Sequence, residues 1–168
     1  PEIQKKYGRS GNFGLDDQLT AIKWVKNNIA DFGGDSENIT LMGQSAGAIS
    51  IQYLCCNNAN HGLFQKAIMM SGGGKFPEFS LPRKPEKTYE YWTSFMQKAG
   101  LSTLDELKHL PLQKVFDTLE VFKPTRKDNT YNTMPVVDGV LIPDSISSAV
   151  IMALFGTVSV YAILFATG

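Results

Sequence analysis

Apolar residues recur at helical spacing in the early part of the chain and define one amphipathic helix. Its apolar face is formed by Leu15, Leu19, Ile22, Val25 and Ile29. Asp16 and Asp17 fall in the first turn, where acidic side chains interact favourably with the helix dipole. The glycines of Phe32-Gly33-Gly34 supply the backbone freedom that ends a helix. The pattern predicts one helix from Leu15 to this glycine pair, after a polar loop over residues 1–13.

Two short apolar runs follow, with a segment between them that is apolar on nearly every side. Residues 38–42 and 67–70 have the length and composition of strands, the second of them buried, and residues 46–55 those of a buried helix. A polar turn at residues 57–62 joins the helix to the second strand. Strand, helix and strand with short connections predict a parallel βαβ unit. We therefore expect an α/β fold with a central parallel sheet flanked by helices.

The middle of the chain has a different pattern, which begins with a stretch rich in proline and lysine at residues 75–88. Three helices are predicted after it, at about 86–99, 103–109 and 112–122. Pro111 separates the last two, and Thr103 with Glu106 forms a possible capping box. We interpret residues 75–130 as a helical insertion of the kind that covers an active site, within one partial domain over residues 1–168.

The last part of the chain combines a short extended segment, residues 134–143, with an uncharged tail, residues 145–168. The tail is long enough to span a bilayer. However, Gly156 divides it, residues 158–165 are rich in strand formers, and neither basic nor tryptophan anchors flank it. We predict a buried helix at about 146–155 followed by a core strand. A membrane-associated or aggregation-prone tail, or a reading-frame error, stays open as the alternative.

Composition narrows the class of partner and the compartment. Among the 168 residues, 16 lysines and arginines balance 16 aspartates and glutamates, so nothing favours nucleic acid or an anionic membrane as a partner. No signal peptide is recognisable near the beginning of the sequence. Cys55 and Cys56 are adjacent, which suits neither a structural disulfide nor a zinc site, and they are interpreted as small apolar side chains on a buried helix. A reducing, cytoplasmic compartment fits these features best.

The pentapeptide Gly43-Gln44-Ser45-Ala46-Gly47 lies between the first predicted strand and its helix. A serine in G-x-S-x-G at such a turn is typical of the nucleophile elbow of an α/β-hydrolase. The turn is tight and strained, so glycine two residues before and after the serine avoids side-chain collisions. We predict that Ser45 is a nucleophile and that the Ala46 N–H helps to bind an oxyanion.

Longer motifs on both sides of the pentapeptide make the resemblance more specific. They are Gly11-Asn12-Phe13-Gly14-Leu15-Asp16-Asp17-Gln18, Ala21-Ile22-Lys23-Trp24-Val25, Asn28-Ile29-Ala30-Asp31-Phe32-Gly33-Gly34-Asp35, Gly62-Leu63-Phe64-Gln65-Lys66-Ala67-Ile68, Ser71-Gly72 and Pro135-Val136-Val137-Asp138-Gly139 with Ile142-Pro143. This set strongly resembles the type-B carboxylesterases, the group that includes the cholinesterases and bacterial esterases. The match is dense over residues 11–74 and loose in the helical middle and the tail. Most members have Glu where this chain has Gln44.

The resemblance implies a Ser-Glu-His triad with Ser45 as the nucleophile and the Ala46 N–H as one oxyanion donor. It also implies a partial α/β-hydrolase fold, because the family's glycine-rich oxyanion loop, triad acid and triad histidine have no counterparts in this chain. We therefore expect the middle piece of an esterase that cleaves neutral, fairly apolar esters with water and without metal or cofactor. Such a piece would be inactive alone and would expose strand edges that favour aggregation. The alternative is a catalytically inert esterase-like module or truncated product, since some relatives of the family act in adhesion.

Both histidines have ordinary explanations. His61 precedes Gly62 in a turn and is interpreted as a surface residue. His109 follows Glu106 by three residues on a predicted helix, so a Glu–His pair is geometrically possible. Triad partners in this fold lie on loops after later strands, however, which argues against a catalytic His109.

The remaining polar candidates are also better explained by structure. Asp138 and Asp144 are acids of the right type for a triad, but Asp138 begins a turn-forming Asp-Gly pair. No cluster of histidines and cysteines suggests a metal site, and Asp16 and Asp17 are interpreted as helix-start charges. The Ser71 hydroxyl either hydrogen-bonds near the site or binds backbone groups of its own loop. The Gly72-Gly73-Gly74-Lys75 run lacks the spacing of a phosphate-binding loop.

Overall fold

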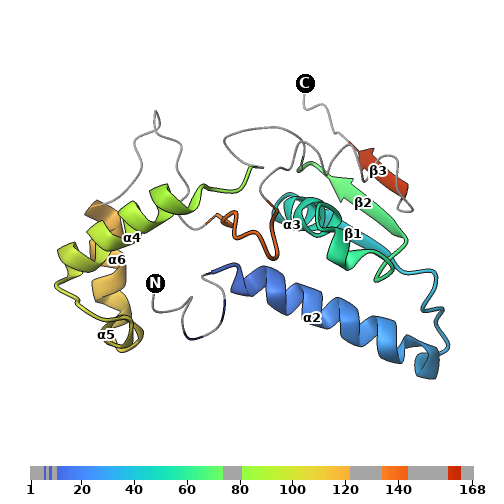
Figure 1. Cartoon of the computed structure of the whole chain (residues 1–168), viewed down its shortest axis with the longest axis horizontal. Coiled ribbons are helices and arrows are strands. Elements are labelled where there is room, and N and C mark those ends of the chain that lie inside the picture. Colours follow the sequence, from blue (N-terminus) through green and yellow to red (C-terminus); the bar gives the residue numbers. More distant parts are fainter. Residues whose placement is uncertain are drawn as a thin grey trace. The chain divides into compact units, whose positions relative to one another are not determined.

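The computed structural model describes residue 6, residue 8, residues 11–73, 81–121 and 134–143, and the backbone of residues 159–163. The chain divides into two compact units (Figure 1). One unit combines Gly11–Leu81 with Val137–Gly168, and the other combines Pro1–Ser10 with Pro82–Val136.

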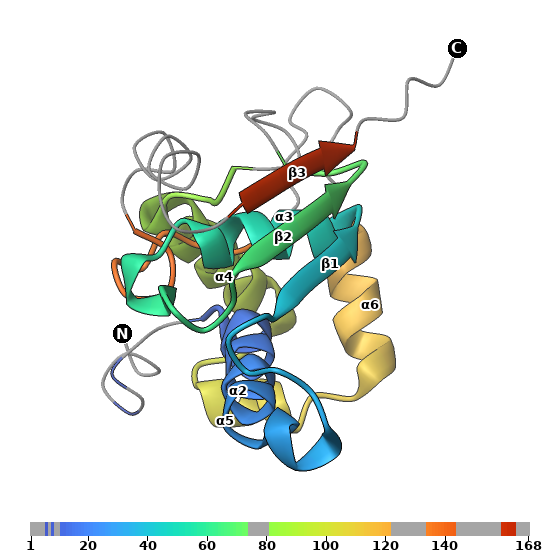
Figure 2. The ribbon, with the colours of Figure 1, turned by 90° about the vertical axis from the view of Figure 1, so that its right-hand side faces the viewer.

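The first unit is built around a three-stranded parallel sheet. In chain order its elements are α2 (Phe13–Asn28), η1 (Ile29–Phe32), β1 (Thr40–Gln44), α3 (Ala46–Cys55), η2 (Asn58–Asn60), β2 (Lys66–Met70) and β3 (Ser159–Ile163). The strand order is β1-β2-β3, and Figure 2 shows the three arrows side by side and pointing the same way. Thr40 pairs with Lys66, and Lys66 pairs with Ser159. The predicted parallel βαβ unit is confirmed as β1-α3-β2.

The helix predicted from Leu15 is confirmed, but it ends in two steps. The α-helical part stops at Asn28, and the single 3-10 turn η1 carries the chain on to Phe32. Gly33 then adopts φ 80°, and its N–H donates to the carbonyl of Ala30 at 3.0 Å. A Cβ on Gly34 would lie 2.5 Å from Cγ1 of Ile29, so the second glycine is needed for space. The glycine pair therefore stops the helix, as expected.

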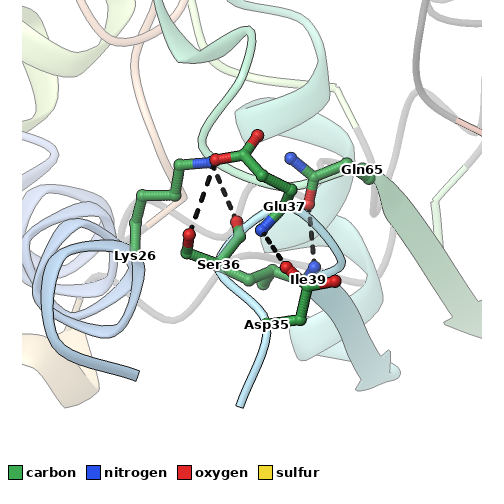
Figure 3. A network of polar contacts seen from close by, with 6 residues as sticks. All are labelled: Lys26, Asp35, Ser36, Glu37, Ile39 and Gln65. Atoms are coloured by element: carbon green, nitrogen blue, oxygen red, sulfur yellow. Dashed lines mark hydrogen bonds and ion pairs between the residues drawn. The ribbon is translucent and has the colours of Figure 1, made fainter. Parts of the chain in front are cut away.

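The segment that leads from η1 to β1 is fixed by polar contacts (Figure 3). Lys26 of α2 donates from Nζ to the carbonyl of Ser36 and to Oε1 of Glu37, both at 2.8 Å. The N–H of Ile39 donates to Oε1 of Gln65 at 2.8 Å. These bonds tie the start of β1 both to the end of α2 and to the residue before β2.

The core of the sheet unit lies around α3. Its buried members are Leu15, Leu19, Tyr53, Leu54, Cys56, Phe64, Leu141 and Ile142. Four consecutive residues of α3, at positions 51–54, are buried, so the helix is covered around a full turn. This confirms the prediction of a buried helix over residues 46–55.

β1 is less covered than its apolar sequence suggested. It begins two residues later than expected and runs to Gln44, and its exposure alternates along the strand. Leu41 belongs to the core on the α3 side, whereas Met42 is 69% exposed on the opposite face. The alternation arises because successive side chains of a strand point to opposite faces. Among the described residues, only the α3 side of this strand is covered.

The tail predictions are tested in part. The backbone of β3 lies within the predicted strand at residues 158–165 and pairs with β2, which confirms a strand there. The predicted helix at 146–155 lies outside the described residues. Among the helices that the structure describes, none is both long and apolar enough to cross a membrane.

The second unit contains α4 (Pro85–Ala99), α5 (Leu104–Lys108) and α6 (Leu112–Val121), which confirms the three predicted helices. α4 packs against α6, and Phe95 of α4 is fully buried with its ring edge-on to Trp92. The capping box of α5 is formed: Thr103 Oγ1 accepts from the Glu106 N–H, and Glu106 Oε2 accepts from the Thr103 N–H. Hydrogen bonds from the Ser102 and Thr103 N–H groups lower the pKa of Glu106. That residues 75–130 cover an active site stays a prediction.

Candidate active site

The Gly43–Gly47 turn joins β1 to α3 through a single residue. β1 ends at Gln44 and α3 begins at Ala46, so Ser45 alone makes the change of direction. Its backbone has φ 51° and ψ −115°, a conformation that L-residues rarely adopt. Such a backbone costs about 1–3 kcal/mol and persists only where the surroundings enforce it. The strand–turn–helix context expected for this serine is therefore present, together with the expected strain.

Hydrogen bonds at both ends of Ser45 enforce this conformation. Its N–H donates to the carbonyl of Met70, at the end of β2, at 2.9 Å. Its carbonyl accepts from the Ile49 N–H, in the first turn of α3, at 3.1 Å. The residue is exposed, and within the described part of the chain its hydroxyl makes no hydrogen bond. The backbone of Ser45 is thus fixed while its Oγ is left available.

The two glycines of the turn differ in what they do. A Cβ on Gly43 would lie 2.6 Å from the carbonyl carbon of Gly47 and 2.9 Å from Cδ1 of Ile51, so only glycine fits. A Cβ on Gly47 would meet no atom of the described residues within 4 Å. The expectation that both glycines prevent a collision is therefore wrong for Gly47. The backbone of Gly47 lies next to Gly43, so a side chain on Gly43 would collide with that backbone, whereas a side chain on Gly47 would not enter this contact.

Ala46 is the first residue of α3 and is exposed. The first N–H groups of a helix have no intrahelical acceptor, and the helix dipole adds partial positive charge at this end. The N–H next to Ser45 can therefore stabilise negative charge that develops beside the serine. Ser45 and Ala46 are neighbours in the chain, and their chemical roles stay predictions.

The described residues place one histidine beside an acid, and that exposed pair lies within a single short helix, with Nδ1 of His109 3.8 Å from Oδ2 of Asp105. His61 is exposed after η2, in agreement with its interpretation as a surface residue. His109 is the C-cap of α5, and its Nδ1 lies 2.8 Å from the carbonyl of Asp105. The carboxylate of Glu106 binds the N–H groups of Ser102 and Thr103 instead, because it closes the capping box. The possible Glu106–His109 pair is therefore not formed.

Asp138 stabilises a turn, as its Asp-Gly sequence predicted. Its Oδ1 accepts from the N–H groups of Val140, Leu141 and Ile142 at 3.0, 2.8 and 2.9 Å. Its Oδ2 accepts from Nδ2 of Asn12 at 2.9 Å. This last bond could not be predicted from the sequence, because it joins residues 126 positions apart.

The other polar candidates do not form a site. Asp16 lies in the first turn of α2, as predicted for a helix-start charge, but Asp17 lies beyond that turn, because the helix begins at Phe13 and not at Leu15. No group of three or more histidines, cysteines or acids in the described ranges could hold a metal ion. Asp144, Gly74 and Lys75 lie outside those ranges. Ser71, at the end of β2, has φ 50° and is exposed, so a second strained serine follows the neighbouring strand.

The adjacent cysteines behave as buried thiols. Both are free, and Cys56 is buried while Cys55 is half-buried. Burial raises the pKa of Cys56 to about 11, and burial together with the neighbouring Cys56 raises the pKa of Cys55 to about 12. Their interpretation as small apolar groups rather than reactive ones agrees with this environment.

Comparison with known proteins identifies the family of the chain. A model of the carboxylesterase family matches residues 5–164. The chain is 39% identical over 144 residues to the bile salt-activated lipase of Mus musculus, covering 80% of this chain and 23% of that protein. It is 34% identical over 145 residues to the para-nitrobenzyl esterase of Bacillus subtilis (strain 168), covering 84% and 28% respectively. It is also 36% identical over 140 residues to neuroligin-2 of Homo sapiens, covering 80% and 16%.

Solved esterase structures have the same fold. A thermophilic pNB esterase superposes with a TM-score of 0.77 at 30% identity, covering 94% of this chain and 32% of that one. The carboxylesterase EST55 of Geobacillus stearothermophilus superposes with a TM-score of 0.71 at 34% identity, covering 94% and 33%. The chain thus spans about a quarter to a third of the esterases that it matches. Its fold is part of the α/β-hydrolase fold, and the chain belongs to the carboxylesterase family.

Proposed function

We propose that this chain is the middle part of a carboxylic ester hydrolase that works through an acyl-enzyme on Ser45. The observation that carries the proposal is the Ser45 backbone, at φ 51° and ψ −115°, with an exposed side chain at the N-cap position of α3. Strain of this kind is rarely kept unless it serves a site.

In this proposal Oγ of Ser45 attacks the carbonyl carbon of the ester. The Ala46 N–H donates to the oxygen that becomes negatively charged in the tetrahedral intermediate. The intermediate expels the alcohol and leaves an acyl group on Ser45, and water then releases the acid by the same route. A general base must take the serine proton. The described residues hydrogen-bond no histidine to Ser45, so base and acid come from the rest of the longer protein.

The substrate class follows from the family and from the charge of the chain. Two of the relatives are named for ester cleavage, the bile salt-activated lipase and the para-nitrobenzyl esterase. The formal net charge of this chain is zero, which does not favour a charged ester. We therefore assign neutral, fairly apolar esters to the complete enzyme, with water as the second substrate and no cofactor.

An inert esterase-like module is the second candidate. Identity does not separate the two, because neuroligin-2, whose name describes no esterase, is 36% identical and the Bacillus esterase 34% identical. The intact turn at Ser45 favours the enzyme. A binding module has no need of an exposed serine on a strained backbone, with a hydroxyl that bonds none of the described residues.

The test uses the longer protein, expressed from the complete coding sequence. We expect saturable hydrolysis of p-nitrophenyl acetate and stoichiometric labelling of Ser45 by a fluorophosphonate. Ser45→Ala should abolish both. Ser94→Ala is the matched control, because Ser94 is an exposed helical serine whose hydroxyl bonds only its own helix, at the carbonyl of Glu90. Hydrolysis that survives Ser45→Ala, or a longer protein without hydrolysis, would contradict the proposal.

The present chain alone should neither hydrolyse the ester nor be labelled. A serine hydroxyl without a base is an ordinary alcohol at neutral pH. Rapid labelling of Ser45 in this chain would show that the base lies within it.

A further inference from the structure

The glycine run after β2 has no role in the reaction proposed so far. β1 and β2 are parallel, with Gln44 paired with Met70, so the residues that follow both strands emerge at the same edge of the sheet. Ser45 follows one strand directly, and Ser71-Gly72-Gly73 follows the other. Gly72 therefore lies beside the Gly43–Gly47 turn.

Gly72 packs directly on the backbone of Ser45. A Cβ at this position would overlap the carbonyl oxygen of Ser45. It would also lie 3.0 Å from the carbonyl carbon of Ser45 and 3.0 Å from Cβ of Ala48. Any side chain at residue 72 would push the Ser45 carbonyl away from its present position.

The carbonyl of Ser45 and the N–H of Ala46 belong to one peptide plane. In a trans peptide the two groups are rigidly linked and point in opposite directions. A contact that fixes the carbonyl therefore also fixes the direction of the Ala46 N–H. On the other side of Ser45, the carbonyl of Met70 holds the serine N–H at 2.9 Å.

We propose that Gly72 is a positioning residue that sets the direction of the oxyanion-binding Ala46 N–H through the Ser45 carbonyl. The assignment deepens the proposed function and rests on it for its catalytic meaning. Its structural part, the contact between residue 72 and the Ser45 peptide plane, is independent of any activity.

Gly73 provides a matched comparison. Its φ is 88°, so alanine there would be strained, and the added Cβ would approach Oε1 of Gln52 at 2.8 Å. That oxygen is the end of the buried Gln52 side chain, which would have to shift to make room, and no atom of Ser45 is among the three nearest. Gly73→Ala therefore strains the same loop without pressing on the turn. Gly14→Ala in α2 is a neutral control, because its Cβ would have no atom within 4 Å among the described residues.

The structural test is hydrogen exchange of individual amides in this chain. The Ile49 N–H bonds the Ser45 carbonyl and so reports directly on the peptide plane of Ser45 and Ala46. The Ser45 N–H bonds Met70 and reports on the preceding peptide of the same turn. The Cys56 N–H, bonded to the Gln52 carbonyl at 3.0 Å, reports on the far end of the same helix. We expect Gly72→Ala to speed exchange at Ser45 and Ile49 about 10-fold or more and to leave Cys56 unchanged. Equal acceleration at all three amides, or none, would overturn the proposal.

The functional test uses the longer protein. Loss of one oxyanion donor lowers kcat on the order of 100- to 1,000-fold, so a misaligned donor should lower it about 10- to 100-fold with little change in KM. Gly73→Ala and Gly14→Ala should keep kcat within about 3-fold of the wild type. A rise in KM alone, or equal losses of kcat in Gly72→Ala and Gly73→Ala, would contradict a positioning role. If the longer protein shows no Ser45-dependent hydrolysis, the proposed function fails while the exchange result still decides the contact.

A second variant covers the case in which Gly72→Ala does not fold. Ala48→Gly in the same chain removes the methyl group 3.0 Å from the new Cβ and leaves only the contact with Ser45. The double variant should fold and still show the selective exchange at Ser45 and Ile49. A double variant with wild-type exchange would show that packing on α3, and not the Ser45 peptide, requires glycine. Failure of both variants to fold would make Gly72 a residue of the fold and would also overturn the proposal.

Discussion

The carboxylate of Asp138 should be one of the strongest polar contributors to the stability of the sheet unit. It accepts three backbone N–H groups through Oδ1 and the Asn12 side chain through Oδ2, all between 2.8 and 3.0 Å. Two of the donating residues, Leu141 and Ile142, are buried core members. Asp138 therefore anchors a core segment and joins it to the start of α2.

The magnitude follows from these bonds. At a net value of about 1 kcal/mol for each hydrogen bond, Asp138→Ala should lower the free energy of unfolding by about 3–4 kcal/mol. Asp138→Asn keeps a carbonyl oxygen for the three N–H groups but places an NH2 group opposite the donor Nδ2 of Asn12, so only that one bond is lost and the cost should be about 1 kcal/mol. With an m-value of about 2 kcal/mol/M in urea, the two midpoints should fall by about 1.5–2 M and 0.5 M.

The assay is urea unfolding of this chain followed by circular dichroism. Asp31→Ala is the control, because Asp31 is exposed and makes no hydrogen bond with its side chain among the described residues, so its change should stay within about 0.5 kcal/mol. A double-mutant cycle with Asn12→Ala should give a coupling energy of at least about 0.5 kcal/mol. The reasoning is refuted if Asp138→Ala is no more destabilising than Asp31→Ala, or if Asp138→Asn costs as much as Asp138→Ala.

Three further predictions concern packing, the turn and the thiols. Phe95 is fully buried against Trp92, so Phe95→Ala should lower the free energy of unfolding by about 3–5 kcal/mol. Phe116 is 53% exposed, so Phe116→Ala should lower it by less than about 1 kcal/mol. Equal unfolding midpoints for the two variants, monitored by tryptophan fluorescence, would contradict this. In urea unfolding, Gly43→Ala should destabilise the chain strongly, because the added Cβ would collide with the Gly47 backbone and Ile51. Gly47→Ala should be neutral or stabilise the chain by up to about 1 kcal/mol, because its Cβ would meet no atom of the described residues within 4 Å. A larger loss of stability in Gly47→Ala than in Gly43→Ala would contradict this difference. Because burial raises the pKa of Cys56 from 9.0 to about 11 and that of Cys55 from 9.0 to about 12, the unfolded state ionises first, so stability should fall as pH rises above 9. Cys55→Ala with Cys56→Ala should remove that part of the pH dependence, and an unchanged slope between pH 9 and 11 would count against buried thiols.

Local sequence signals predicted the elements well, because each depends on neighbouring residues. The helix at 46–55, the capping box of Thr103 and the stop at Gly33 all follow from spacing, side-chain reach or backbone freedom within a few positions. The exposure of Met42 was not predictable, because it depends on which elements cover each face of the sheet.

The same distinction applies to the candidate site. The G-x-S-x-G pattern indicated the turn and the strained Ser45, since both belong to one short segment. The pattern gave no sign that Gly72 packs on Ser45 or that Asn12 bonds Asp138, because those partners meet only in the folded unit. The pattern also predicted that a side chain at Gly47 would collide with its surroundings, and the structure shows no described atom within 4 Å of a Cβ there.

The pairing of β3 with β2 has a consequence for the order of folding. Thr40 and Lys66 are roughly 25 residues apart in the chain, whereas Lys66 and Ser159 are roughly 90 apart. Closing the longer loop costs about 1 kcal/mol more entropy, and α4, α5 and α6 all lie within it. The β1-α3-β2 unit should therefore form first, and with it the strained backbone of Ser45, while β3 joins the sheet late. During synthesis, the Ser45 turn can therefore fold before β3 has left the exit tunnel of the ribosome.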